Sequence, residues 1–355
     1  MGGINRREFI KNLSLATLGT ALSPALLNVS AAPRSKVVVA RDPEATADKG
    51  RSVNADVIQN MMDTAAKHLT GQATVADAYS SLFPSLAGDH IIAVKVNTMQ
   101  TWQFGDGCRK ILDAIVKGLT SIGVAENNII VYDKSNTDLV SCGYVINTGG
   151  NGVRCFGTNE RGWGVDDTVF RPGGQSIRLS KILTECDHLI NLALIRDHVG
   201  TGASLSLKNH YGSVNCPSCL HGPDFRCDPH MAELNALEPV REKTRLIVIA
   251  ALVGVYQGHH MSPQFVYDGL IASQDPVAAD YTAWQIIDEE RVARGLRTLA
   301  ETGRPPKALE TAAELGLGAN DPNNIELIGV GEGKAVQPQD MLYATWGKIK
   351  REQSR

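Results

Sequence analysis

The sequence lacks several patterns that assign a protein to a large functional class. It contains no GxSxG turn, no phosphate-binding P-loop and no GxGxxG after a strand. These absences argue against serine hydrolases, nucleoside triphosphatases and ordinary dinucleotide-binding enzymes. Beyond the N-terminus there is no basic run and no interleaving of aromatic with basic residues. Proteins that bind nucleic acids depend on such clusters, so we expect no nucleic-acid partner.

Long apolar runs are also missing. After residue 31 no stretch reaches the roughly 18 consecutive apolar residues of a membrane-spanning helix, so no stable membrane span is expected. The net charge of the 355 residues is −3, with 43% hydrophobic and 21% charged residues. This is the composition of an ordinary globular protein. The length accommodates one large domain or two of average size.

The N-terminal residues 1–31 have the pattern of an export signal. An arginine pair, Arg6-Arg7, precedes a weakly apolar stretch from Leu13 to Leu27, and Val29-Ser30-Ala31 is a small-residue cleavage pattern. We expect a twin-arginine signal peptide that the export machinery reads, and a periplasmic or otherwise exported mature chain. An amphipathic helix with a chance arginine pair is the alternative.

This export route affects what the cysteines can do. The twin-arginine machinery carries proteins that fold before export, often with a cofactor inserted in the cytoplasm. Outside the cytoplasm, however, disulfides persist. The export signal therefore favours both a preloaded metal and a disulfide, and the choice must come from the cysteines themselves.

The remaining chain alternates short apolar runs with amphipathic segments. The β-branched runs predict buried strands, and apolar residues spaced three or four apart predict helices. A strand, a helix and a strand within residues 89–133 form a βαβ unit, which implies a parallel sheet. Strands are expected at 36–40, 89–97, 127–133, 188–195, 246–255, 267–272 and 324–330, and helices at 54–69, 109–122, 182–186, 275–294 and 308–315.

These elements predict an α/β fold with a mostly parallel sheet flanked by helices. We expect a single domain over residues 32–345, organised as one body or two lobes. Residues 141–174 are rich in glycine and predict an insertion of hairpins and loops. Residues 346–355 form a polar tail.

Several segments resemble a known family. They are VKVNT at 94–98, IIVYD at 129–133, INLALIRDH at 190–198 leading to SLSLKNHYG, then IASQDPVAAD at 271–280 and a closing IELIGVG. In this order they resemble the family called domain of unknown function 362, over residues 89–331. The most specific matches are Leu207-Lys208-Asn209 with Gly212, and the DPVA segment with Asp280.

The resemblance implies the fold and an association with iron–sulfur chemistry, because many members carry ferredoxin-type cysteine runs. This chain has no C-x2-C-x2-C run. It also lacks the acidic residue that the family tends to carry at the end of the strand that reads LIVIAALVGV here. The resemblance therefore implies little about the reaction.

One stretch, NCPSCLHGPDFRCDPH, concentrates cysteine and histidine. The spacing C-x2-C-x7-C-x2-H can place thiolates and an imidazole around one ion, and soft thiolates select zinc or an iron–sulfur cluster. The predicted metal ligands are Cys216, Cys219, Cys227 and His230, and the predicted cofactor is an iron–sulfur cluster or zinc. A disulfide between two of these cysteines, or plain buried cysteines, are the alternatives.

Polar residues gather where predicted strands end. In open α/β sheets, ligands bind outside the carboxyl ends of the strands, and small residues let backbone amides approach an anion. We predict catalytic roles for His198, Lys208 and Lys95, and substrate-binding roles for Asn209 and Asp280. Lys95 lies in an apolar run, and a structural pair with Asp133 or Asp280 is the alternative. Asp275 is expected to cap a helix, and at most one of His259 and His260 could bind a metal.

Three functions remain open on the sequence alone. The first is an exported metalloprotein, an iron–sulfur or other metal-dependent redox enzyme that acts on a small anionic molecule. The second is a non-catalytic periplasmic binding protein whose cysteines form a disulfide clasp. The third is an isomerase-like enzyme that acts on a small carboxylate.

Overall fold

A computed structural model describes residues 34–99, 101–258 and 262–331 of the chain. The predicted signal peptide at 1–31, the polar tail at 346–355 and the His259-His260 pair lie outside the described residues. Among the described residues, no helix combines the length and apolar character needed to cross a bilayer.

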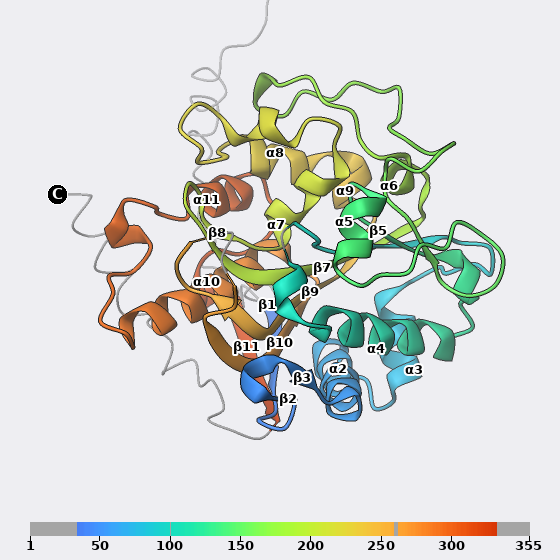
Figure 1. Cartoon of the computed structure of the whole chain (residues 1–355), viewed down its shortest axis with the longest axis horizontal. Coiled ribbons are helices and arrows are strands. Elements are labelled where there is room, and N and C mark those ends of the chain that lie inside the picture. Colours follow the sequence, from blue (N-terminus) through green and yellow to red (C-terminus); the bar gives the residue numbers. More distant parts are fainter. Residues whose placement is uncertain (1–33, 100, 259–261, 332–355) are drawn as a thin grey trace, which may run out of the picture. The chain divides into compact units, whose positions relative to one another are not determined.

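A mixed but mostly parallel sheet of nine strands forms the centre of the fold, and helices flank it (Figure 1). The strand order is β11-β1-β10-β9-β7-β4-β5-β6, and β8 pairs with β7 outside this row. The strands are β1 (Ser35–Arg41), β4 (Ile92–Lys95), β5 (Ile129–Tyr132), β6 (Arg154–Cys155), β7 (His188–His198), β8 (Gly202–Ser204), β9 (Thr244–Val255), β10 (Phe265–Ser273) and β11 (Ile325–Gly331). A separate ribbon pairs β2 (Thr46–Ala47) with β3 (Ser52–Val53).

Neighbouring strands from β9 to β6 are all parallel, as the βαβ pattern predicts. β10 runs antiparallel to both β9 and β1, and β8 runs antiparallel to β7. The order of the parallel strands reverses beside β4, because β5 lies on one side of it and β7 on the other. Such a reversal leaves a crevice at the carboxyl ends of the strands.

Helices cover both faces of the sheet because successive strand residues point to opposite faces. In β1, Val38 belongs to the core beneath one helix layer, whereas Val37 and Val39 belong to the core beneath the other. The first layer contains α2 (Ala55–Thr70), α3 (Val75–Leu82) and α4 (Gly107–Ser121). The second contains α6 (Lys181–Glu185), α7 (Ser206–Asn209), α8 (His230–Ala236), α9 (Glu238–Arg241), α10 (Pro276–Val292) and α11 (Lys307–Glu314).

The glycine-rich segment 141–174 follows α5 (Asn136–Ser141) and forms little regular structure. Its contacts include an isolated bridge between Asn147 and Cys155, and β6 adds two residues to the edge of the sheet. The segment thus contributes loops and short bridges beside the main sheet, in keeping with its glycine content.

Candidate functional site

A cavity of about 310 Å³ lies at the carboxyl ends of the neighbouring strands β7, β4 and β5. Four of the residues predicted from the sequence line it: Lys95, His198, Lys208 and Asn209. They come from β4, from the end of β7 and from α7, so the fold brings together residues up to 114 positions apart, as in the Lys95–Asn209 contact. The cavity lies where the strand order reverses, which is the usual ligand position in such sheets.

Lys95 is buried and paired. Its ammonium lies 2.8 Å from Asp133 Oδ1 and donates to the Val96 carbonyl at 2.6 Å and to Asn209 Oδ1 at 3.2 Å. The other carboxylate oxygen of Asp133 accepts from the backbone and hydroxyl of Thr98. Burial lowers the pKa of Lys95, and the Asp133 carboxylate counteracts this effect. Asp133 is one of the two partners that the sequence suggested for Lys95.

Gly212 makes room for this pair. A Cβ atom at Gly212 would lie 2.1 Å from Asp133 Oδ1 and 2.6 Å from Lys95 Nζ. Contacts that short do not occur, so a side chain at this position would force the buried pair to shift. The family-like segment LKNHYG therefore has a structural reason for its glycine.

Asn209 connects strands rather than presenting free polar atoms. Its amide nitrogen donates to Asn191 Oδ1 at 2.8 Å and to the carbonyls of Lys95 and Leu192, each at 3.2 Å. Its oxygen accepts from Lys95. Asn209 thus fixes β4 against β7 at the floor of the cavity. Its substrate-binding role stays a prediction, and its side chain already has these four partners.

Lys208 has a different environment from Lys95, because no carboxylate among the described residues forms an ion pair with it. Its ammonium lies 3.1 Å from His221 Nε2 and 3.9 Å from the centre of the Tyr211 ring. The Cys227 thiol is also beside it. Burial is the main cause that lowers the pKa of Lys208 to about 8. This lysine can therefore gain or lose a proton near neutral pH.

His221 receives a defined tautomer from its neighbours. Its Nδ1 lies 3.1 Å from the Pro217 carbonyl oxygen, which can only accept, so Nδ1 carries the proton. Nε2 is then free to accept from Lys208. Burial lowers the pKa of His221, and the charge of Lys208 lowers it further. His221 belongs to the stretch in which the sequence predicted metal ligands, and the structure places it in the cavity wall.

Arg196 is a cavity residue that the sequence analysis missed. It lies on β7, is 2% exposed, and donates to the Met99 carbonyl at 2.8 Å. Among the described residues no carboxylate forms an ion pair with it. Its buried Nε has no hydrogen-bond partner in the described structure. Burial lowers the pKa of Arg196 to about 10, which leaves it charged at neutral pH. An arginine at the end of an otherwise apolar strand was the available signal.

His198 is held in one orientation at the end of β7. The backbone N–H groups of Gly200 and Thr201 both donate to its Nδ1, each at 3.1 Å. An Nδ1 that accepts cannot carry a proton, so Nε2 carries it in the neutral ring. The ring stacks against that of His221, with 5.9 Å between centroids. His198 thus supplies an oriented imidazole to the cavity.

Asp280 occupies a place outside this cavity. Its carboxylate accepts from the backbone N–H groups of Ser206 and Leu207, at 2.8 and 3.0 Å, and from the Ser206 hydroxyl at 2.5 Å. It therefore attaches α10 to the start of α7. Burial raises the pKa of Asp280 to about 7. The predicted substrate-binding role stays untested, and the observed contacts are structural.

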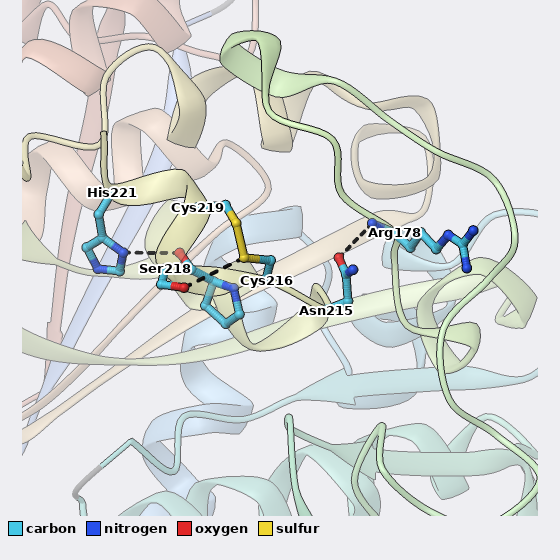
Figure 2. The surroundings of a disulfide bond; sticks show 7 residues. Arg178, Asn215, Cys216, Ser218, Cys219 and His221 are labelled. Carbon is cyan, nitrogen blue, oxygen red and sulfur yellow. Dashed lines mark hydrogen bonds between the residues drawn. A yellow bond between two sulfur atoms is a disulfide. The ribbon is translucent and has the colours of Figure 1, made fainter. Parts of the chain in front are cut away.

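The cysteine-rich stretch contains a disulfide between Cys216 and Cys219 (Figure 2). This is the alternative that the sequence left open beside a metal. The turn between them begins the short 3₁₀ helix η6 (Pro217–His221). The Ser218 hydroxyl lies 3.6 Å from the Cys216 sulfur. The side chain of Asn215, the residue before Cys216, accepts from the Arg178 N–H at 2.8 Å. The other five cysteines, Cys108, Cys142, Cys155, Cys186 and Cys227, are free.

The four predicted metal ligands do not converge in this oxidised form. Cys216 and Cys219 use their sulfurs in the disulfide, so they cannot act as thiolate ligands while it persists. Cys227 lies beside Lys208 and Tyr211, and burial raises the pKa of its thiol. Within the described ranges, no three cysteine, histidine or acidic side chains are grouped as metal ligands. A metal at these four residues stays a prediction about a reduced form.

The charges around the cavity favour an anion. Its charged lining residues are the cations Lys95, Lys134, Arg196 and Lys208 and the anions Asp133 and Asp138. Four cations against two anions leave an excess of two positive charges. Because Lys95 is already neutralised by Asp133, the excess resides mainly on the buried Arg196 and Lys208. Buried charges without partners are costly, and a bound anion would compensate them.

Comparisons with known proteins identify the family and little beyond it. A family model described as "Domain of unknown function (DUF362)" matches residues 92–285. Among curated proteins nothing matches. Among solved structures, the chain is similar to the lactate racemase apoprotein from Thermoanaerobacterium thermosaccharolyticum, with 12% identity and a TM-score of 0.37. That match covers 71% of this chain, which spans 57% of the racemase chain.

Proposed function

Because the chain belongs to the DUF362 family, whose description names no activity, we propose a function from the cavity itself. The chain is an enzyme that binds a small organic anion at the strand ends and exchanges a proton with it through Lys208 and His221. The anion is a small carboxylate or a molecule of similar size and charge. This function corresponds to the third one that the sequence left open, an isomerase-like enzyme that acts on a small carboxylate, with acid–base groups now named.

The observation that carries this proposal is the pair of buried cations, Arg196 and Lys208. They are 2% and 8% exposed, they line one cavity, and neither has an acidic partner among the described residues. By contrast Lys95 is neutralised in the same wall. Proteins seldom retain unpaired buried charges, because desolvation costs several kcal/mol for each ion. An anionic ligand supplies the missing negative charge.

The proton chemistry follows from the geometry of Lys208 and His221. With a pKa of about 8, Lys208 is mostly protonated at pH 7 and can give up a proton without a large cost. His221 can accept at Nε2, 3.1 Å away, while the Pro217 carbonyl holds its Nδ1 proton. His198 lies in the same cavity wall, and the N–H groups of Gly200 and Thr201 fix the orientation of its ring.

This proposal is favoured over a non-catalytic binding protein by one feature. A protein that only binds an anion benefits from a permanently charged lysine, whereas burial moves the pKa of Lys208 toward neutrality. Acid–base catalysis needs a pKa near the working pH. The metal-dependent redox enzyme remains a separate hypothesis, and it requires the Cys216–Cys219 disulfide to open before a metal can bind.

Calorimetric titration with oxalate, malate and inorganic phosphate tests the proposal on the purified mature protein. We expect at least one to bind, and the variant Lys208→Met to bind it at least tenfold more weakly, because a charged hydrogen bond is lost. Lys110→Met is the matched control, since Lys110 lies on α4, does not line the cavity and pairs with exposed Asp113. Equal affinities for wild type and Lys208→Met would contradict the assignment.

Catalysis is tested separately from binding. Incubation with malate in D2O, followed by proton NMR, reports exchange of the hydrogen on the carbon next to the carboxylate. We expect exchange with the wild type and its loss in Lys208→Met. Tight binding without exchange of any bound carboxylate would favour the non-catalytic binding protein instead.

A further inference from the structure

The disulfide belongs to a turn that forms part of the cavity wall. We call residues 216–221 the cysteine turn. Cys216 and Cys219 close its first half, and Pro217 and His221 line the cavity. Figure 2 shows the disulfide with the Ser218 hydroxyl directed at the Cys216 sulfur. The disulfide therefore lies on the same short 3₁₀ turn as His221, the proposed acid–base group.

A purely stabilising role does not explain this disulfide well. It joins residues only three apart in sequence. A disulfide stabilises a fold mainly by lowering the entropy of the unfolded chain. For so short a loop this stabilisation is smaller than the roughly 3 kcal/mol expected for a 15-residue loop. Other bonds already hold the turn: Tyr211 donates to the Leu220 carbonyl at 2.6 Å, and the Cys227 N–H donates to the His221 carbonyl at 3.0 Å.

The exposure of the two sulfurs fits exchange chemistry. Cys216 and Cys219 are both partly exposed, whereas four of the five free cysteines are buried. Thiol–disulfide exchange requires that a thiolate reach a disulfide sulfur in line. The pattern C-x-x-C places both sulfurs on one exposed turn, where such an attack is open.

We propose that the Cys216–Cys219 disulfide is a redox site that exchanges with a dithiol, and that its state controls anion binding in the cavity. The second half rests on the proposed function of that cavity, and the first half does not. The reductant is a small or protein-borne dithiol. The oxidised chain has the closed turn described above, and the reduced chain has a looser one.

The exchange is balanced in two steps. A thiolate of the dithiol attacks the Cys219 sulfur, a mixed disulfide forms, and Cys216 leaves as a thiolate. In a disulfide Cys216 has no proton, so the hydrogen bond to its sulfur comes from Ser218, which stabilises the leaving thiolate. The second thiol of the reductant, as a thiolate, then attacks the reductant's own sulfur in the mixed disulfide. Cys219 leaves, the reductant departs as a disulfide, and two electrons and two protons have reached the chain.

The coupling to the cavity passes through the Pro217 carbonyl. That oxygen accepts the His221 Nδ1 proton at 3.1 Å, and His221 Nε2 contacts Lys208 at 3.1 Å. The disulfide bridges the residues on either side of Pro217 and Ser218, so it fixes the direction of this carbonyl. Once the bridge opens, the carbonyl can rotate away and the orientation of His221 toward Lys208 is lost.

The exchange itself is tested by thiol labelling under native conditions. The folded protein is treated with 1 mM dithiothreitol at pH 7.5 and then with iodoacetamide, and its peptides are analysed by mass spectrometry. We expect labels on Cys216 and Cys219 within minutes while the buried free cysteines stay unlabelled and circular dichroism is unchanged. Labels that require denaturant would overturn the proposal, because they would show a structural disulfide.

The coupling is tested by calorimetry with the best-binding probe among oxalate, malate and inorganic phosphate. We expect reduction to weaken its binding about tenfold, as for a lost charged hydrogen bond. The double variant C216S/C219S should bind as weakly with or without reductant, and Cys108→Ser is the matched control with unaltered response. Labelling without any change in affinity overturns the control of binding. Failure of the oxidised wild type to bind any probe instead overturns the proposed function, and labelling still decides the exchange.

Discussion

The two cavity lysines show how environment separates residues of one type. Lys95 has a carboxylate at 2.8 Å and two further hydrogen-bond acceptors, so its charge serves the fold. Lys208 has an imidazole, a thiol and an aromatic face instead, and these do not neutralise it. The sequence grouped both as catalytic. The contacts separate Lys95 as a positioning residue from Lys208 as the group suited to proton transfer.

Anion binding should depend on pH through Lys208. The pKa of about 8 means that the ammonium is present below pH 8 and is lost above it. We therefore expect the affinity for a bound carboxylate to be constant from pH 6 to 7 and to fall by up to about tenfold per pH unit above 8. Calorimetry at each pH measures this. Lys208→Met should show weak binding without this dependence, and an unchanged profile in that variant would assign the titration to another group.

A side chain at Gly212 should destabilise the fold. Because a Cβ atom would overlap both members of the Lys95–Asp133 pair, we expect Gly212→Ala to lower the free energy of unfolding by about 2 kcal/mol. Urea denaturation measures the change. Gly88→Ala is the matched control, since nothing lies within 4 Å of its Cβ position. Equal midpoints for the two variants would show that the pair moves aside without cost.

The sequence predicted Lys95, His198, Lys208 and Asn209 at one site because each follows or ends an apolar strand. It missed Arg196 and undervalued His221 for a common reason. Their roles depend on the absence of an acidic partner beside them in the described part of the cavity. The sequence does not show which side chains become neighbours on folding. The substrate-binding role predicted for Asp280 stays untested, and its observed contacts are with the backbone of α7.

At the scale of elements, hydrophobic periodicity was sufficient for most of the sheet. The runs at 188–195 and 246–255 became β7 and β9 because long, nearly continuous apolar stretches suit a strand buried on both faces. The direction of β10 was not predictable, since alternation is the same in parallel and antiparallel strands. α7 has four residues and β8 has three, which is too short for any periodic signal.

The start of α10 gives a prediction at this scale. Asp275 is its cap, as expected from the sequence: Oδ1 accepts from the Ala278 N–H at 2.8 Å, and Oδ2 accepts from the Ala319 N–H at 2.9 Å. We expect Asp275→Ala to lower the free energy of unfolding by about 2 kcal/mol, since both amides lose their acceptor. Thermal denaturation measures it. Asp321→Ala, which removes an exposed cap, should cost less than half as much.

The contact between α10 and α7 should make stability depend on pH. The pKa of Asp280 is raised to about 7 in the folded chain, above its usual value of 3.8. Between these values the folded state binds more protons than the unfolded state, so stability falls as pH rises from 4 to 7. Urea midpoints across this range measure the slope. Asp280→Asn should flatten it, and an equally steep slope in that variant would place the titration elsewhere.

At the scale of the whole molecule, export and redox state belong together. The proposed twin-arginine signal would deliver a folded chain to an oxidising space, where the Cys216–Cys219 disulfide can form. The metal hypothesis depends on the same history, because only a chain loaded before oxidation could use these thiolates. Iron, zinc and sulfide analysis of protein purified without oxygen separates the two states.

Export should require the arginine pair. We expect replacement of both Arg6 and Arg7 by lysine to retain the chain, uncleaved, in the cytoplasm, because the receptor reads the two arginines. Fractionation followed by immunoblotting measures this. Replacement of Arg34 by lysine, outside the predicted signal, is the control. Unchanged export of the double variant would favour an ordinary N-terminal helix over a twin-arginine signal.

The pairing of β1 has a consequence for how the chain is made. β1 lies between β10 and β11, and Ser273 donates to the Lys36 carbonyl across 237 residues of sequence. Such a contact gives the topology a high contact order, and it cannot form on the ribosome until β10 has emerged. Until then β1 and β9 each lack a neighbour and expose an edge that can aggregate. A nascent chain that ends before residue 265 therefore lacks β10, the strand that joins β1 to β9.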